Sequence, residues 1–282
     1  MIRSAPRGFT LIELILAMVM MLIVGGAVYQ LLVTTQRVAA VQTERLALQA
    51  NVRGAALVVL NELKELATTS GGSAAQNDIV SIAPSSISYR AARGFGYVCQ
   101  AVGSQISIAR NQFTGHRDPQ PVRDSVWLYV ASSAGADSGW IPLGITNVST
   151  ATPCTGTAGP AITISTSGAP SSAALVAGTP VRIYERMELT LYQSDGASWL
   201  GMRSVGAGEV IQPLFGPLAD GDGFQLAYFD AAGSPATLPM MVRSVAVTLR
   251  AVAQTMSSIG GRRGHPATEE LTTQVVLRNA SR

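Results

Sequence analysis

Residues 9–33 of the chain read FTLIELILAMVMMLIVGGAVYQLLV, an apolar run in which Glu13 is the only charged side chain. About 20 apolar residues are enough for a helix to cross the hydrocarbon core of a bilayer. The run is also longer than the apolar segment of an ordinary secretory signal peptide, which is cut after that segment. The sequence therefore predicts a membrane-spanning helix that stays attached to the rest of the chain.

The residues before this run are short and basic. Arg3 and Arg7 lie between Met1 and Gly8, and the next charge after Glu13 is Arg37. Positive residues that precede a spanning helix tend to stay in the cytoplasm. We therefore expect the N-terminus to face the cytoplasm and the C-terminal bulk of the chain to be exported.

Glu13 separates two hypotheses for the apolar run. A plain signal anchor explains the arginines and the apolar residues, but not a carboxylate within the membrane. Such a carboxylate costs about 2–3 kcal/mol at the centre of a spanning helix. A buried charge of this kind needs a partner, so Glu13 is a candidate functional residue.

The segment Gly8-Phe9-Thr10-Leu11-Ile12-Glu13 resembles the processing site of type IV prepilins and type II secretion pseudopilins. The resemblance implies that a membrane peptidase cuts between Gly8 and Phe9 and methylates the new amine of Phe9. It also implies that Glu13 pairs with this amine on a neighbouring subunit during filament assembly. Gly8 suits the cut because it presents no side chain to the peptidase. Residues 1–8 are then the leader, and residues 9–36 are the transmembrane and assembly helix.

The same resemblance implies partners and a location. The partners are the prepilin peptidase and methylase, other pilins or pseudopilins, and the inner-membrane assembly platform. The chain is expected first in the inner membrane, with a single pass, and then in a periplasmic or cell-surface filament. Nucleic acid is not an expected partner, because only 18 of the 20 basic residues remain without Arg3 and Arg7, beside 17 acidic ones.

The helix is expected to continue beyond the membrane as an amphipathic extension over residues 37–68. Apolar residues recur there at steps of three, four or seven, which predicts one buried stripe along a helix from Phe9 to about Leu66. The residues of this stripe are Val41, Leu48, Val52, Ala56, Val59, Leu63 and Leu66. Within the apolar half, Gly25-Gly26 is interpreted either as a soft point or as a place of close packing against a neighbouring helix.

Residues 69–282 are predicted to form a β-rich head, so the fold class is α+β with a long helix packed on antiparallel sheets. Alternating and β-branched runs dominate there, and Asp195-Gly196 between two of them indicates a hairpin turn. The candidate strands are 79–82, 86–89, 97–102, 105–110, 125–131, 140–145, 161–165, 181–193, 198–203, 224–229, 242–252 and 271–277.

The order of the later strands resembles W-type minor pilins and J-type minor pseudopilins. This resemblance covers the pair 181–193 and 198–203, the run Phe224–Phe229, the strand 242–249 and the closing run 275–279. It implies a pilin-like head of two packed antiparallel sheets and a low-copy place in the filament.

The two cysteines, Cys99 and Cys154, are compatible either with a disulfide or with two free thiols. Their spacing and the presence of only two histidines give no sign of a zinc site, so we expect no metal and no cofactor. A disulfide suits an exported chain and is worth about 4 kcal/mol for a loop of this length.

Two loops with polar side chains can each be interpreted either as purely structural or as functional. Asp220-Gly221-Asp222-Gly223 is expected to be a tight turn, since the later acidic ligands of a calcium loop are missing. Arg262-Arg263 with His265 is expected to be a solvated hairpin loop, with contact to nucleic acid as the alternative.

The function predicted from the sequence is that of a minor pilin or pseudopilin, a structural subunit of a type IV pilus or type II secretion filament. The alternative hypothesis is a filament-tip or membrane-anchored adhesin or DNA-binding module on the same scaffold. We do not expect an enzyme, because the chain has no nucleophile elbow, no His-Glu-x-x-His and no phosphate-binding loop.

Overall fold

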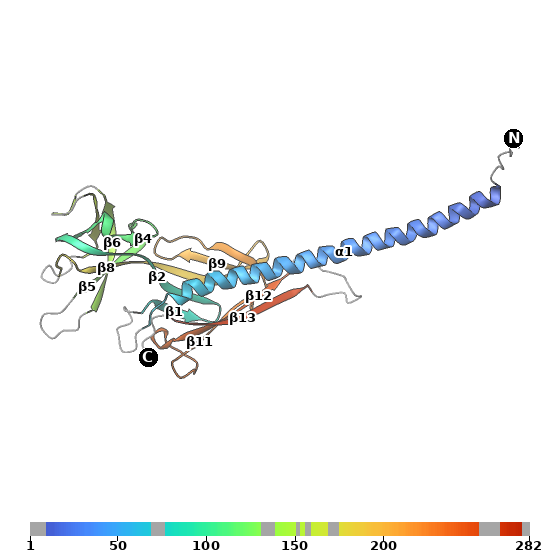
Figure 1. Cartoon of the computed structure of the whole chain (residues 1–282). Helices are drawn as coiled ribbons and strands as arrows, with labels where there is room; N and C mark the ends of the chain where they lie inside the picture. The colour runs from blue at the N-terminus through green and yellow to red at the C-terminus, as the bar shows by residue number, and fades with distance from the viewer. Residues whose placement is uncertain are drawn as a thin grey trace.

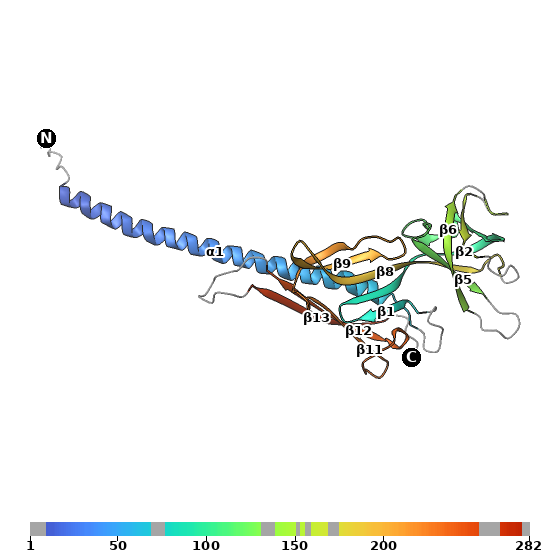
Figure 2. The ribbon, with the colours of Figure 1, turned by 180° about the vertical axis from the view of Figure 1, so that it is seen from behind.

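The computed structural model describes residues 10–68, 77–130, 139–150, 153–155, 159–168, 175–253 and 266–277. A single long helix, α1 (Leu11–Lys64, 54 residues), leads into a head whose described part contains 13 strands. Figures 1 and 2 show the first half of α1 reaching away from the head, with the strands β5 and β6 at the opposite end of the molecule.

The strands follow one another along the chain with two short 3-10 turns, Arg110–Gln112 and Pro239–Met241. Their bounds are β1 Ile79–Ala83, β2 Ser86–Val102, β3 Gln105–Ala109, β4 Thr114–Gly115, β5 Asp124–Val130, β6 Gly139–Ser149, β7 Ala161–Thr166, β8 Pro180–Ser194, β9 Ala197–Ser204, β10 Gln212–Leu218, β11 Phe224–Phe229, β12 Ser244–Val252 and β13 Thr268–Val276.

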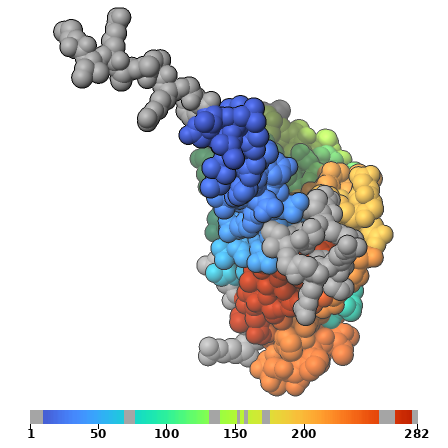
Figure 3. Space-filling view, turned by 90° about the vertical axis from the view of Figure 1, so that its right-hand side faces the viewer, coloured from blue at the N-terminus to red at the C-terminus, as the bar shows by residue number. Residues whose placement is uncertain are grey.

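The second half of α1 packs on β10, β12 and β13 through the predicted apolar stripe. Viewed from its N-terminal end, the helix lies along one side of the head (Figure 3). Six of the seven predicted stripe residues are buried, and Val41 is half-buried. Ala55 is buried as well, because the helix approaches the sheet closely at this turn.

Gly54 permits this close approach. A Cβ at Gly54 would lie 2.9 Å from the ring of Phe215 on β10, closer than real Cβ contacts. The sequence did not predict β10, because Pro213 and Pro217 within it are unusual in a strand interior. The strand tolerates both prolines, and its pairing with β9 shifts register at two places.

β2 and β8 are long antiparallel strands that run through the whole head. They pair from Ser86 opposite Thr190 to Tyr97 opposite Pro180. The prediction of two separate strands, 86–89 and 97–102, is therefore wrong. The Gly-rich and Arg-rich segment between them stays in the ladder, where a bulge between Ala92 and Gly94 absorbs one extra residue.

One half of each long strand belongs to a closed ring of strands, which we call the barrel lobe. Around this ring β2 pairs with β3, β3 with β7, β7 with β6, β6 with β5, β5 with β8, and β8 with β2. All six strands contribute to one buried cluster, which consists of Val98, Ile106, Ile108, Val126, Leu128, Ile145, Ile162, Ile164, Val181 and Ile183. The head is thus one continuous network rather than the two separate packed sheets expected from the resemblance.

The other half of each long strand belongs to the helix lobe, formed by α1, β1, β9, β10, β11, β12 and β13. Its core joins the buried stripe of α1 to apolar residues of these strands, including Leu189, Phe224 and Val247. The predicted hairpin between β8 and β9 is confirmed, because Asp195 and Gly196 both have positive φ, as a two-residue I′ turn requires.

A charged cluster lies between the two cores. The buried carboxylate of Glu185 on β8 lies 2.7 Å from Arg93, 3.2 Å from Arg117 and 2.5 Å from Arg123. Arg117 also pairs with the buried Asp124 at 2.6 Å. Buried charges are stable only with such partners, so this cluster fixes β5 and the chain before it against the centre of the head.

Asp78 attaches the end of the helix to the head. Its Oδ2 accepts a hydrogen bond of 2.7 Å from the backbone N–H of Ala67, just after α1 ends. Burial raises the pKa of Asp78 to about 6, against the opposing effects of that hydrogen bond and of Arg90 and Arg182.

We expect Leu63→Ala to lower the free energy of unfolding of the head by about 2–5 kcal/mol, because the side chain is fully buried under the sheet. Leu57→Ala is the matched control, since Leu57 lies on the same helix and is 62% exposed. Its effect should stay within about 0.5 kcal/mol. Denaturant unfolding of the full chain in detergent, followed by tryptophan fluorescence, measures both variants. Equal losses would contradict the assigned helix face.

The raised pKa of Asp78 predicts a pH dependence of stability. The folded pKa of about 6 lies above the ordinary aspartate pKa of 3.8, so the stabilising contribution is full below about pH 3.8 and is lost as the pH rises through about 6. As the pH rises between these limits, the free energy of unfolding of the wild type should fall by up to about 3 kcal/mol relative to that of Asp78→Asn. The free energies of unfolding of both proteins at about pH 4 and about pH 7 measure this difference. Parallel pH profiles would count against it.

Candidate assembly and processing site

The helix begins with a capping box formed by Thr10 and Glu13. Glu13 Oε2 accepts hydrogen bonds of 2.9 Å from the backbone N–H and from the hydroxyl of Thr10. In return, the backbone N–H of Glu13 donates to Thr10 Oγ1 at 3.4 Å. These bonds satisfy groups that a helix start otherwise leaves unpaired, so the first turn is defined by its own residues.

Sequence reasoning missed the role of Thr10. The pattern Thr-x-x-Glu before an apolar run is a known signal of a helix start, and it is present here at residues 10–13. Glu13 was recognised for its charge, and the structure adds that the same carboxylate organises the end of the helix.

Gly8 and Phe9, the residues of the predicted cut, lie outside the described residues, immediately before Thr10. A cut there would place a new amine one residue before the N-cap of α1. A cation is unfavourable next to a helix N-terminus, where the backbone dipoles already concentrate positive charge. Glu13, the acidic side chain in the first turn, offsets the positive charge of the amine and of the helix N-terminus.

Within the part of the chain that the structure describes, nothing covers the first half of α1. Its most apolar window of 18 residues has a mean hydropathy of 2.6, and none of it is buried. The large apolar side chains are exposed on every side of the helix: Leu11, Ile12, Leu14, Ile15, Leu16, Met18, Val19, Met20, Met21, Leu22, Ile23, Val24, Val28, Tyr29, Leu31 and Leu32. A helix that is apolar all round needs lipid or other helices around it.

Glu13 has room for a second partner. Both hydrogen bonds from Thr10 use Oε2, and no hydrogen bond to Oε1 occurs within residues 10–68 or the described head. The predicted partner, the methylated amine of a neighbouring subunit, can therefore approach Oε1 without displacing the cap. This pairing stays a prediction, because it joins two chains.

Gly25 and Gly26 leave the helix unbroken. A Cβ built at either residue meets no atom within 4 Å. Close packing at this point therefore requires the helix of a neighbouring subunit, whereas a soft point requires only the glycines themselves.

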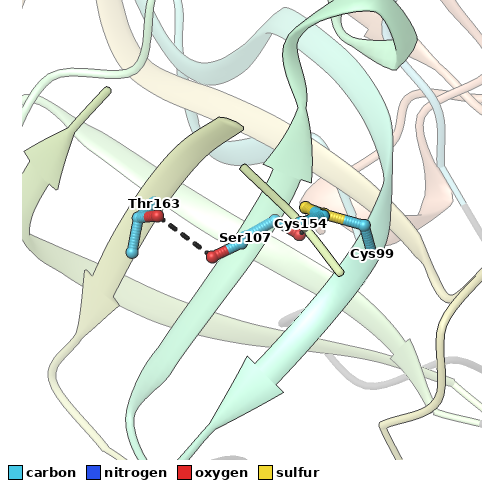
Figure 4. The surroundings of a disulfide bond; sticks show 4 residues. All are labelled: Cys99, Ser107, Cys154 and Thr163. Atoms are coloured by element: carbon cyan, nitrogen blue, oxygen red, sulfur yellow. Dashed lines mark hydrogen bonds between the residues drawn. A yellow bond between two sulfur atoms is a disulfide. The ribbon is translucent and has the colours of Figure 1, made fainter. Parts of the chain in front are cut away.

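Cys99 and Cys154 form a disulfide in the structure, with their Cα atoms 6.0 Å apart (Figure 4). The bond connects β2 to the chain between β6 and β7. The neighbouring strands β3 and β7 are joined beside it by a hydrogen bond of 3.0 Å between the hydroxyls of Ser107 and Thr163. The disulfide belongs to the barrel lobe, whose strands β5 and β6 lie at the opposite end of the molecule from the helix start (Figure 1).

The acidic loop at residues 220–223 is a tight turn, as expected. Gly221 has a positive φ, and the two carboxylates have separate partners. Asp220 accepts hydrogen bonds from Gln193 and Ser198, while Asp222 forms an ion pair with Arg250. Among the residues that the structure describes, no three His, Cys, Asp or Glu side chains gather as metal ligands.

The basic loop with Arg262, Arg263 and His265 lies outside the described residues. The other histidine, His116, lines a groove of about 610 Å³ between the end of α1 and the barrel lobe, together with Glu62 and Arg93. The charged cluster around Glu185 could not be found from the sequence, because Arg93 and Glu185 are 92 residues apart.

Comparison with known proteins supports the interpretation of the N-terminus. Residues 3–29 match the family model described as the prokaryotic N-terminal methylation motif. No curated protein and no solved structure matches the chain. The matched residues include the predicted cut, the capping box and most of the exposed apolar helix. The chain therefore carries the N-terminal signal of type IV pilins and pseudopilins.

Proposed function

We propose that the protein is a minor pilin or pseudopilin that is built into a type IV pilus or type II secretion filament. The observation that carries this proposal is the continuous helix α1. Its first half is exposed, apolar and begins with an acidic first turn, and its second half is firmly packed on a folded head. Such a helix anchors the head where lipid or other helices cover the first half of α1.

Processing precedes assembly in the proposed mechanism. The prepilin peptidase removes residues 1–8 at the cytoplasmic face of the inner membrane, and the new amine of Phe9 is methylated. Because the cut precedes the apolar run, the mature chain keeps its membrane helix. The assembly platform then moves this helix out of the lipid and into the filament.

Glu13 guides docking in this mechanism. Its Oε2 accepts hydrogen bonds from Thr10 and so caps its own helix. Its Oε1 accepts a hydrogen bond from the amine of a neighbouring subunit. A carboxylate in an apolar bundle is stable only when it is paired, so subunits that dock out of register leave Glu13 unpaired. The charge thereby favours one register among the many that an apolar surface permits.

The head supports the assignment to the minor class. The strands β8, β9, β11, β12 and β13 occur in the order on which the resemblance to W-type minor pilins and J-type minor pseudopilins rests, with β10 between β9 and β11. The barrel lobe makes the head bulky at the end opposite the N-terminus of α1 (Figure 2). The proposed role is structural, and catalysis by the head is not part of it.

Mass spectrometry of the mature protein tests the processing step. We expect the chain from membrane and filament fractions to begin with N-methylated Phe9. Gly8→Leu should leave the leader attached, because a side chain at this position obstructs access to the backbone. A native chain that keeps Met1, or that is cut after residue 25, would refute the processing step.

Glu13→Gln separates the charge from the helix cap. Glutamine still completes a capping box, so the helix start and the processing should be retained, while the pairing with an amine is lost. We expect the variant to accumulate in the membrane and to be largely absent from sheared filaments, as measured by immunoblotting of both fractions.

Thr10→Ala is the matched control for this experiment. It removes the cap at a cost of about 1 kcal/mol but keeps the carboxylate. It should therefore be incorporated better than Glu13→Gln. Normal incorporation of Glu13→Gln would contradict the pairing mechanism.

A further inference from the structure

The outer surface of the barrel lobe carries side chains that filament assembly does not use. On β8, Val181 and Ile183 point into the barrel core, so Arg182 and Tyr184 point outward. Arg182 lies opposite Phe95 of β2 on one side and opposite Trp127 of β5 on the other. Directly paired residues of antiparallel strands share a face of the sheet, so these side chains form one surface.

We call this surface the arginine–aromatic face. It extends over β2, β8, β5 and β6, and it consists of Arg90, Phe95, Tyr97, Trp127, Tyr129, Trp140, Arg182, Tyr184 and Arg186.

Guanidinium groups and rings alternate across this face. The guanidinium of Arg182 lies 4.4 Å from the centre of the Trp140 ring, and Tyr129 lies 5.5 Å from the same ring. Arg90 lies 5.2 Å from the ring of Trp127, which is 5.1 Å from that of Tyr184. Cation–π contacts of this kind hold a guanidinium in place and leave its N–H edges available for an anion.

The face has a buried floor and an exposed rim. Trp127 is only 3% exposed and Tyr184 only 6%, so they are fixed beneath the surface. Tyr97, Phe95 and Tyr129 are 43%, 38% and 37% exposed. Large aromatic side chains gathered beside arginine are typical of binding surfaces, where the rings lose contact with water when the partner arrives.

Arg182 and Arg186 are the exposed arginines of the face, while Arg90 is half-buried. Neither Arg182 nor Arg186 forms an ion pair within the described residues, and their hydrogen bonds go to the hydroxyls of Tyr184 and Ser88. By contrast, Arg93, Arg117, Arg123, Arg203 and Arg250 are all paired with carboxylates. Asp78, which is buried beside the face, interacts with Arg182 electrostatically but forms no ion pair with it within the described residues.

We propose that the arginine–aromatic face binds a glycan that carries carboxylate groups. The C–H faces of sugar rings stack on exposed aromatic rings, whose π faces are electron-rich. The planar fork of Arg182 matches the two oxygens of a carboxylate. Nucleic acid fits less well, because it places a phosphate on every nucleotide and needs a denser row of unpaired cations than Arg182 and Arg186 provide.

Binding of oligogalacturonate to the full mature chain in detergent tests this proposal, with its methyl ester as the neutral probe. Isothermal titration calorimetry gives the Kd, and tryptophan fluorescence reports contact with the face. We expect the acid to bind at least about tenfold more tightly than the ester. Arg182→Gln should weaken binding of the acid by about tenfold, while Arg53→Gln, an exposed site on α1, should leave it unchanged.

A second variant and a second polymer make the outcomes decisive. Arg186→Gln replaces Arg182→Gln if the latter lowers the Tm of the head. Absence of binding, or equal affinity for acid and ester, overturns the proposal. Tighter binding of a single-stranded thymidine oligonucleotide than of the uronate also overturns it, in favour of nucleic acid. Arg182→Gln should still be incorporated normally into filaments. A negative result in the glycan-binding test therefore leaves the proposed function intact.

Discussion

Apolar surface on α1 has to be covered over its whole length, and this requirement accounts for most of the structure. In the second half of the helix only one stripe is apolar, so a single sheet surface is enough to bury it. In the first half the apolar residues face all directions, and the most apolar window is not buried by any of the residues that the structure describes. The division between these two patterns, after about residue 36, separates the part of the helix that folds with the head from the part that needs lipid or neighbouring subunits.

The head is organised by β2 and β8, which pair with each other in both lobes. The face that covers α1 in one lobe becomes the interior of the barrel in the other, and Glu185 lies where the two cores meet. The three arginines around it provide positive charge that apolar residues could not, and they come from segments that only the folded chain brings together. Filament assembly and the arginine–aromatic face therefore use opposite ends of one continuous structure.

The helix was predictable because its signals are local. Periodicity predicted its buried stripe and placed its C-terminal end at about Leu66, close to the observed end at Lys64. The Asp195-Gly196 dipeptide predicted the hairpin. β2 was predicted as two strands because Arg90, Arg93 and Gly94 resemble a turn, and only pairing with β8 shows that they belong to a strand. β10 was missed because of its prolines. The arginine–aromatic face depends on which residues lie opposite one another on four strands, and this register cannot be obtained from one strand at a time.

The shared strands also determine how the molecule would carry a load. A partner held at the barrel lobe pulls on β2 and β8 along their length, while α1 is anchored at the other end (Figure 1). Because both strands continue from one lobe into the other, their covalent backbones carry such a pull between the lobes, and no hydrogen bond has to break for it to be transmitted. The two strands that join the lobes thus make the head a mechanical tether, in which tension at the barrel lobe is carried along β2 and β8 to the lobe that packs on α1.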